Sequence, residues 1–178
     1  MKATTKILML LVLIGLTTTG IAAPSKTFTR DVAVNTFQKL TAVGNMEIIF
    51  VDNNENKIRL EGSKQAIATV VMEQNDQELS VTRNENGDND EIVTIYVPVS
   101  EMNTLIIGGD ASVKCETTLH ANVLSLLHKG TGSVQLKSDA DVIQTMTTKS
   151  GRIAVEGAYT STVSRMDASN HLIVAYSK

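Results

Sequence analysis

Four short segments that decide the fold recur in the second half of the chain: SVKC (112–115), SVQL (133–136), RIAV (152–155) and HLIV (171–174). Their first apolar residues are Val113, Val134, Ile153 and Leu172, at intervals of 21, 19 and 19 residues. In each segment, inward apolar positions alternate with positions that would face outward, as in a half-buried strand. Small or turn-forming residues precede every segment, so the turns repeat in step with the strands.

A second apolar strand is predicted upstream of each segment, at residues 105–107, 123–127, 142–146 and 163–166. One unit is therefore strand, turn, strand, turn, with a period near 20 residues. This period predicts an all-β, single-domain parallel β-helix, or β-solenoid, with coils of about 20 residues. An antiparallel sandwich or barrel is the alternative, because its short strands also recur roughly every 8 to 12 residues. A sandwich, however, does not require its turn residues to repeat in step.

The first half of the chain shows the same alternation of apolar and polar residues. It predicts strands at residues 46–51, 57–61, 78–83 and 92–97, each bounded by turn-forming residues. Residues 63–73 break the pattern, because their apolar residues recur at spacings of three to four. This segment is predicted to form one short helix or a wide turn.

Residues 1–23 have the order of a secretory signal peptide: basic residues, an apolar run and then small residues. A transmembrane anchor is the alternative, but about ten apolar residues span roughly half of a hydrocarbon core. Cleavage is predicted after Ala22 or Ala23 and leaves one domain, residues 24–178. The loss of Lys2 and Lys6 changes the formal net charge from −3 to −5. We therefore expect an exported protein, periplasmic or extracellular, that does not bind nucleic acid.

Cys115 is the only cysteine of the chain, so it cannot form an internal disulfide. Its place in an alternating run predicts a buried, small hydrophobic residue rather than a reactive thiol. At the other end of the repeats, the predicted strand 171–176 ends two residues before the sequence does. We expect its outer edge to be blunted by twist or to pair with a second copy, giving a weak homodimer.

Four segments of the sequence resemble the auto-transporter adhesin head GIN domain family: FQKLTAVGNMEI (37–48), IRLEG (58–62), ELSV (78–81) and VTIYVP (93–98). The coil turns of that family are matched by Gly109, Gly130, Gly132 and Gly151. The last coil, at residues 167–170, lacks the glycine. The resemblance implies an exported protein with parallel β-helix-like architecture and no assigned catalytic residues. The lipid-anchoring cysteine of many relatives is missing, so a lipid anchor is not implied.

No residue is predicted to be catalytic, to bind a cofactor or to bind a metal. The three histidines, His120, His128 and His171, lack a partner at zinc-ligand spacing and are interpreted as exposed. A serine nucleophile is not predicted either, because the sequence GTGSV (130–134) lacks the glycine that should follow the serine in a nucleophile turn.

The acidic segment 85–91 contains the oxygen ligands that Ca²⁺ prefers, but it does not fit the calcium-loop template. It is interpreted as a hairpin tip between residues 79–83 and 92–97. Residues 52–56 are interpreted in the same way, as a turn between two alternating strands.

Two function classes follow from the sequence. The first is a non-enzymatic, adhesin-like envelope or secreted protein that binds a protein or glycan through polar outer faces. The second is a β-helix enzyme acting on polysaccharides of the envelope. An enzyme would need several titratable groups with perturbed pKa values in one groove, whereas a binding module would present a polar face without such a cluster.

Overall fold

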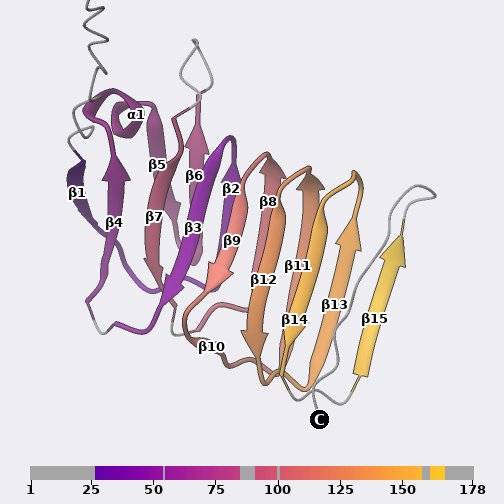
Figure 1. Ribbon diagram of the computed structural model, residues 1–178. Helices are drawn as coiled ribbons and strands as arrows, with labels where there is room; N and C mark the ends of the chain where they lie inside the picture. Colours follow the sequence, from indigo (N-terminus) through magenta and orange to yellow (C-terminus); the bar gives the residue numbers. More distant parts are fainter. Residues whose placement is uncertain (1–26, 54, 85–90, 100, 158–160, 167–178) are drawn as a thin grey trace, which may run out of the picture.

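The computed structural model describes residues 27–53, 55–84, 91–99 and 101–157, and the backbone of residues 161–166. These residues form two β-sheets that face one another across a shared hydrophobic core (Figure 1). The predicted signal peptide, most of the acidic segment 85–91 and the predicted strand 171–176 lie outside the described residues.

The first sheet, called sheet A, has eight strands. In spatial order it contains β1 (Phe28–Ala33), β4 (Lys57–Gly62), β7 (Val93–Pro98), β3 (Met46–Val51), β9 (Ser112–Cys115), β12 (Ser133–Ser138) and β10 (Thr118–Leu119), and β14 (Arg152–Glu156) also pairs with β12. The pairs β1–β4 and β4–β7 are antiparallel, and the other pairs are parallel. Sheet A is therefore a mixed sheet.

The second sheet, called sheet B, has seven strands. In spatial order it contains β15 (Ser161–Met166), β13 (Val142–Thr147), β11 (Val123–Gly130), β8 (Thr104–Gly109), β2 (Lys39–Val43), β6 (Glu78–Arg83) and β5 (Val70–Asn75). Only the pair β5–β6 is antiparallel among these strands. Strand β2 lies between β6 and β8, so the spatial order does not follow the sequence.

The core lies between the inner faces of the two sheets. Strands β3 and β7 bury every second residue, which is the pattern expected for a strand with one face on the core. Ile48, Phe50 and Ile95 have no exposed surface, and Leu40 of β2 faces them from sheet B with none either. Burial of these aliphatic and aromatic side chains is the main favourable term holding the two sheets together.

Helix α1 (Lys64–Ala68) connects β4 of sheet A to β5 of sheet B. It begins at Ser63, whose Oγ accepts a hydrogen bond from the Ala66 N–H at 3.1 Å. It ends at Thr69, whose hydroxyl donates to the Ala66 carbonyl at 2.7 Å. The helix predicted within residues 63–73 is thus present but shorter, because residues from Val70 onward form strand β5.

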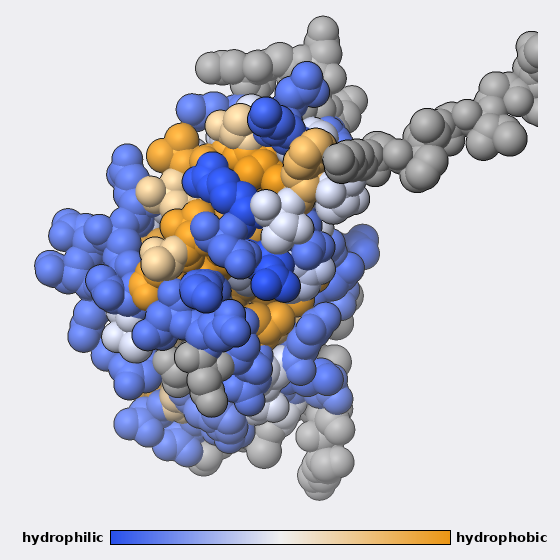
Figure 2. All heavy atoms as spheres, turned by 90° about the vertical axis from the view of Figure 1, so that its left-hand side faces the viewer, coloured by the Kyte–Doolittle hydropathy of each residue, from blue (hydrophilic) through white to orange (hydrophobic). Residues whose placement is uncertain are grey.

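The end of the structure at β1, α1 and β5 has no further strand beyond it among the described residues. Figure 2 views this end and shows hydrophobic surface between hydrophilic side chains. Val32, Val34 and Met72 are partly buried there against the core. Asn35 and Gln74 join the two sheet edges, because the Asn35 N–H donates to Gln74 Oε1 (2.9 Å) and Gln74 Nε2 donates to the Asn35 carbonyl (3.1 Å).

The repeated segments of the second half pair with one another in parallel. Val134 lies opposite both Val113 and Ile153 in sheet A. In sheet B, Val123 lies opposite Val142, and Val142 lies opposite Ser161. The alignment at positions 113, 134 and 153 is therefore present, while the segment 171–174 lies outside the described residues.

The prediction of a parallel β-helix with coils of about 20 residues is wrong. The chain is all-β, but the two mixed sheets form a curled half-barrel in which antiparallel strands occupy one end of each sheet (Figure 1). The physical reason is that an alternation with period 2 reports which face of a strand is buried and not which strand lies beside it. The repeat of about 20 residues extends only over the second half of the chain.

Two predicted turns are also corrected by the sheet order. Residues 79–83 and 92–97 do not form a hairpin, because β6 belongs to sheet B and β7 to sheet A. Residues 52–56 do not join neighbouring strands, because β7 lies between β3 and β4. No helix among the described residues has the length and apolar character needed to cross a membrane.

Candidate functional site

The outer face of sheet A carries a continuous row of side chains from five strands. The strand register places Asp31 opposite Arg59, Arg59 opposite Tyr96, Tyr96 opposite Ile49, and Ile49 opposite Lys114. Side chains directly opposite on paired strands point to the same face of a sheet. Residues widely separated in the sequence therefore form one polar surface with Ile49 near its centre.

Two ion pairs join charged side chains of neighbouring strands on this face. Arg59 Nε lies 3.1 Å from Asp31 Oδ1, and Lys114 Nζ lies 2.5 Å from Glu47 Oε1. Hydrogen bonding to Asp31 raises the pKa of Arg59, and hydrogen bonding to Glu47 raises the pKa of Lys114. Both basic groups therefore keep their positive charge at neutral pH.

A hollow of about 600 Å³ lies over β9, β12 and β14 on the outer face of sheet A. We call it the β9–β12 hollow. Charged side chains of both signs surround it, among them Lys114, Lys137, Glu116 and Glu156. Mixed charges with no excess of one sign suit a polar partner rather than a polyanion such as nucleic acid.

Cys115 borders the β9–β12 hollow and is half-buried rather than fully buried. Its side chain packs against the core, and its Sγ donates a hydrogen bond to the Thr117 carbonyl at 2.7 Å. Burial raises the pKa of the Cys115 thiol, so the thiol stays protonated at neutral pH. A protonated thiol is a poor nucleophile, which agrees with the expected structural role.

A second hollow, of about 490 Å³, lies over β4 and β7 and the end of β3. We call it the Tyr96 hollow, and its lining residues are Asp31, Val51, Asn53, Glu55, Lys57, Arg59, Glu61 and Tyr96. Burial raises the pKa of Tyr96, and the neighbouring Glu61 carboxylate raises it further, so the phenol stays neutral. The hollow thus combines one aromatic ring with both hydrogen-bond donors and acceptors.

The outer face of sheet B differs, because apolar side chains lie at its centre. The register aligns Ile106 with Leu127 and Leu127 with Met146. These three residues line a hollow of about 470 Å³ together with Thr104, Ser125, Leu126, Gln144 and Thr145. The two outer faces of the protein therefore differ in chemistry, one being mainly polar and the other carrying an apolar stripe.

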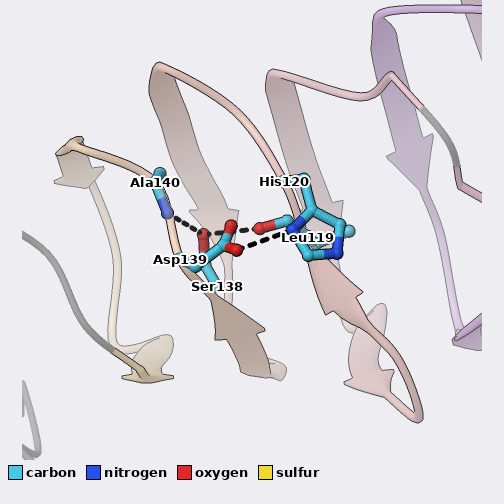
Figure 3. Close-up of polar contacts among 5 residues, drawn as sticks. All are labelled: Leu119, His120, Ser138, Asp139 and Ala140. Atoms are coloured by element: carbon cyan, nitrogen blue, oxygen red, sulfur yellow. Dashed lines mark hydrogen bonds and ion pairs between the residues drawn. The ribbon is translucent and has the colours of Figure 1, made fainter.

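The histidines do not share one environment. His120 is exposed, as expected, and its Nδ1 lies 2.7 Å from Asp139 Oδ2 (Figure 3). Ser138, the residue before Asp139, donates a hydrogen bond to the Leu119 carbonyl and accepts one from the Ala140 N–H, each at 3.1 Å. His171 lies outside the described residues.

His128 contradicts the expectation of an exposed side chain, because it is only 1% exposed. It points inward from β11 and accepts a hydrogen bond at Nδ1 from the Gly130 N–H at 3.1 Å. Gly151 leaves room for the ring, since a Cβ at Gly151 would lie 2.1 Å from His128 Cε1. A lone histidine in an apolar run therefore fits the core because a glycine packs against it.

We expect His128 to make the protein less stable in acid. Burial lowers the pKa of His128 below its usual value of 6.5, and a proton on Nδ1 would also remove the acceptor for Gly130. The unfolded chain therefore takes up the proton first, so stability falls as the pH drops from about 6.5 toward the lowered pKa. Urea unfolding at pH 7.5 and 5.5 should show this loss in the native protein and a smaller loss in His128→Gln. His120→Gln, at an exposed position, is the control, and its loss should exceed that of His128→Gln. An equal loss in all three proteins would contradict the assignment.

No group of three or more histidine, cysteine or carboxylate side chains is arranged to hold a metal ion in the described part of the chain. Sequence reasoning predicted no site residues and did not find the two hollows of sheet A. Their residues come from strands that are distant in the sequence, and only the strand register brings them together. The exposed polar positions of the alternating strands were the one available signal.

Comparison with solved structures supports the all-β fold. A protein from Parabacteroides distasonis described as a "putative lipid binding protein" shares 13% identity, with 82% of this chain and 74% of that chain covered and a TM-score of 0.52. A "putative cell adhesion protein" from Clostridium sporogenes shares 11% identity (85% and 99% covered, TM-score 0.49). A "putative adhesin" from Bacteroides fragilis shares 16% identity (85% and 97% covered, TM-score 0.35). Of these three, only the first has a TM-score above 0.5, and at this identity it shows the fold alone.

Comparison of the sequence with family models gives a match over residues 36–170, to the model described as "Putative auto-transporter adhesin, head GIN domain". The matched region begins just before β2 and extends beyond β15. No curated protein matches the chain.

Proposed function

The chain belongs to the auto-transporter adhesin head GIN domain family, and from that membership we propose an exported, non-enzymatic, adhesin-like protein that binds a protein or glycan partner. The binding surface is the outer face of sheet A. Export is directed by residues 1–23, and the mature protein acts in the periplasm or outside the cell. The name of the family supports the adhesin-like role.

The observation that carries this proposal is the chemistry of the outer face of sheet A. Seven of the eight strands of sheet A contribute residues to the two hollows on this face, and both hollows contain charged side chains of both signs. The ion pairs Arg59–Asp31 and Lys114–Glu47 hold side chains in place before a partner arrives. Such preorganisation reduces the entropy lost on binding.

The pKa values on this face favour binding over catalysis. The pKa values of Arg59, Lys114, Tyr96 and Cys115 are all raised, so each group keeps its ordinary protonation state at neutral pH. General acid–base catalysis needs groups whose pKa values lie near the working pH. An enzyme acting on envelope polysaccharides would need such groups to converge in one groove. Around these hollows, the four shifts move the pKa values further above neutral pH.

The proposal is tested by blocking one outer face at a time. Ile49 and Ile106 are half-buried isoleucines near the centres of the outer faces of sheets A and B. The purified protein is screened against a glycan array and an envelope extract. We expect Ile49→Arg to reduce capture of the identified partner at least about tenfold, because the new side chain covers the surface between the two hollows.

Ile106→Arg is the matched control and should leave capture unchanged while showing that an arginine on an outer face is compatible with folding. Thermal unfolding of both variants checks that they fold equally well. Capture lost in Ile106→Arg and retained in Ile49→Arg would move the binding surface to sheet B. Release of sugar fragments by the native protein would establish the enzyme instead.

A further inference from the structure

We propose that the Tyr96 hollow binds one pyranose ring of a neutral glycan. This inference rests on the proposed function and names the partner class for one part of the same face. It is carried by the aromatic ring that lines the hollow, by the hydrogen-bond donors and acceptors of the other lining residues, and by the charge balance of the hollow.

One aromatic ring, that of Tyr96, lines the hollow. Tyr96 is the only aromatic residue that the described strands place on the outer face of sheet A, since Phe37 and Phe50 are buried and Phe28 shares the inward parity of β1. Tyr96 is half-buried on β7, between the paired strands β3 and β4. The ring therefore loses little rotamer freedom on binding. Its face can stack against the apolar C–H face of a sugar ring, which most polar ligands lack.

Two ion pairs among the lining residues supply hydrogen-bond donors and acceptors. Arg59 pairs with Asp31 at 3.1 Å, and Lys57 lies 3.9 Å from Glu55. Neighbouring hydroxyls of a sugar each donate and accept a hydrogen bond, so each can contact the cation and the carboxylate of one pair. Hydrogen bonds to charged groups are stronger than those between neutral groups. Both ion pairs are present in the structure without a bound sugar.

The charge of the hollow selects against acidic sugars. Its lining contains three carboxylates, of Asp31, Glu55 and Glu61, against the two cations of Lys57 and Arg59. The excess of one negative charge repels sulfate and carboxylate groups, because like charges that approach during binding cost free energy. The volume of about 490 Å³ lies within the usual range for small-molecule sites. It suits one sugar ring with the neighbouring rings of the glycan on the open sheet face.

The test uses an array that holds neutral oligosaccharides of hexose and N-acetylhexosamine beside their sulfated and sialylated forms. We expect the native protein to capture neutral glycans in preference to the acidic forms. Tyr96→Ala should weaken capture at least about tenfold, because the stacking surface is lost. Tyr96→Phe keeps the ring and loses only the hydroxyl group, so its capture should stay within about threefold of native.

Thermal unfolding shows whether Tyr96→Ala still folds. If Tyr96→Ala does not fold, Lys57→Met tests the inference instead. Lys57→Met removes one hydrogen-bond donor from an exposed position without disturbing the core. Capture of glycans that is lost in Ile49→Arg but unchanged in Tyr96→Ala and Lys57→Met would overturn the sugar site and leave the proposed function standing. Capture of an envelope protein but no glycan would do the same. Stronger capture of acidic than of neutral glycans would also overturn it. Failure to capture either kind of partner would overturn both proposals.

Discussion

Gly130→Ala is expected to lower the free energy of unfolding by about 3 kcal/mol or more. Gly130 lies opposite Gly109, where strands β11 and β8 run side by side. A Cβ at Gly130 would lie only 1.9 Å from the Gly109 carbonyl oxygen and 2.9 Å from the carbonyl carbon. The clash is with backbone atoms, so it cannot be relieved by turning a side chain. The two strands would have to separate, and their hydrogen bonds would be lost.

Gly62→Ala is the matched control for this substitution. A Cβ at Gly62 would lie 3.7 Å from its nearest neighbours, which is an ordinary van der Waals contact. We expect it to change the free energy of unfolding by less than about 1 kcal/mol. Urea unfolding of the two variants measures the difference. Equal stabilities for both variants would show that β8 and β11 are not packed at this distance.

The second large effect is expected for Phe50→Ala, which should cost about 3 to 5 kcal/mol of stability. Phe50 is fully buried on β3, and its register neighbours are Val97 of β7 and Cys115 of β9. Truncation removes most of an aromatic side chain from the centre of the core. It leaves a cavity that the paired backbones on either side keep from collapsing.

Phe28→Ala provides the comparison, because Phe28 lies on the edge strand β1 and is 38% exposed. Its removal should cost less than half as much, since the side chain already contacts water in the folded protein. Thermal and urea unfolding of both variants give the two values. A larger loss for Phe28→Ala would mean that the core is centred nearer to β1 than the structure places it.

The strands with one buried face could be predicted from the sequence. Alternation marked β3, β4, β6 and β7 because each buries every second residue, or nearly so. Strand β1 was missed because five of its six residues are exposed, which leaves no alternation to detect. Strand β5 was missed because Val70 and Val71 continue the three-to-four spacing of the helix residues before them.

The order of strands and the candidate site could not be predicted in the same way. Alternation in β3 and β4 says nothing about β7, which lies between them. For that reason the antiparallel end of each sheet was missed, and a single parallel stack was expected. The Tyr96 hollow depends on the same missing information, because Asp31, Arg59 and Tyr96 become neighbours only through the pairing of β1, β4 and β7.

The central position of β2 and β3 also determines when the chain can fold. Ile48 of β3 pairs with Ile95 and Val113, and Leu40 of β2 pairs with Leu79 and Leu105. At about 5 to 20 residues per second, the ribosome finishes β8 and β9 several seconds after β2 and β3, so the early strands lack these partners during that time. Pairing between such distant segments is intrinsically slow. Until those partners are made, the edges of β2 and β3 stay unpaired and can pair with a second nascent copy.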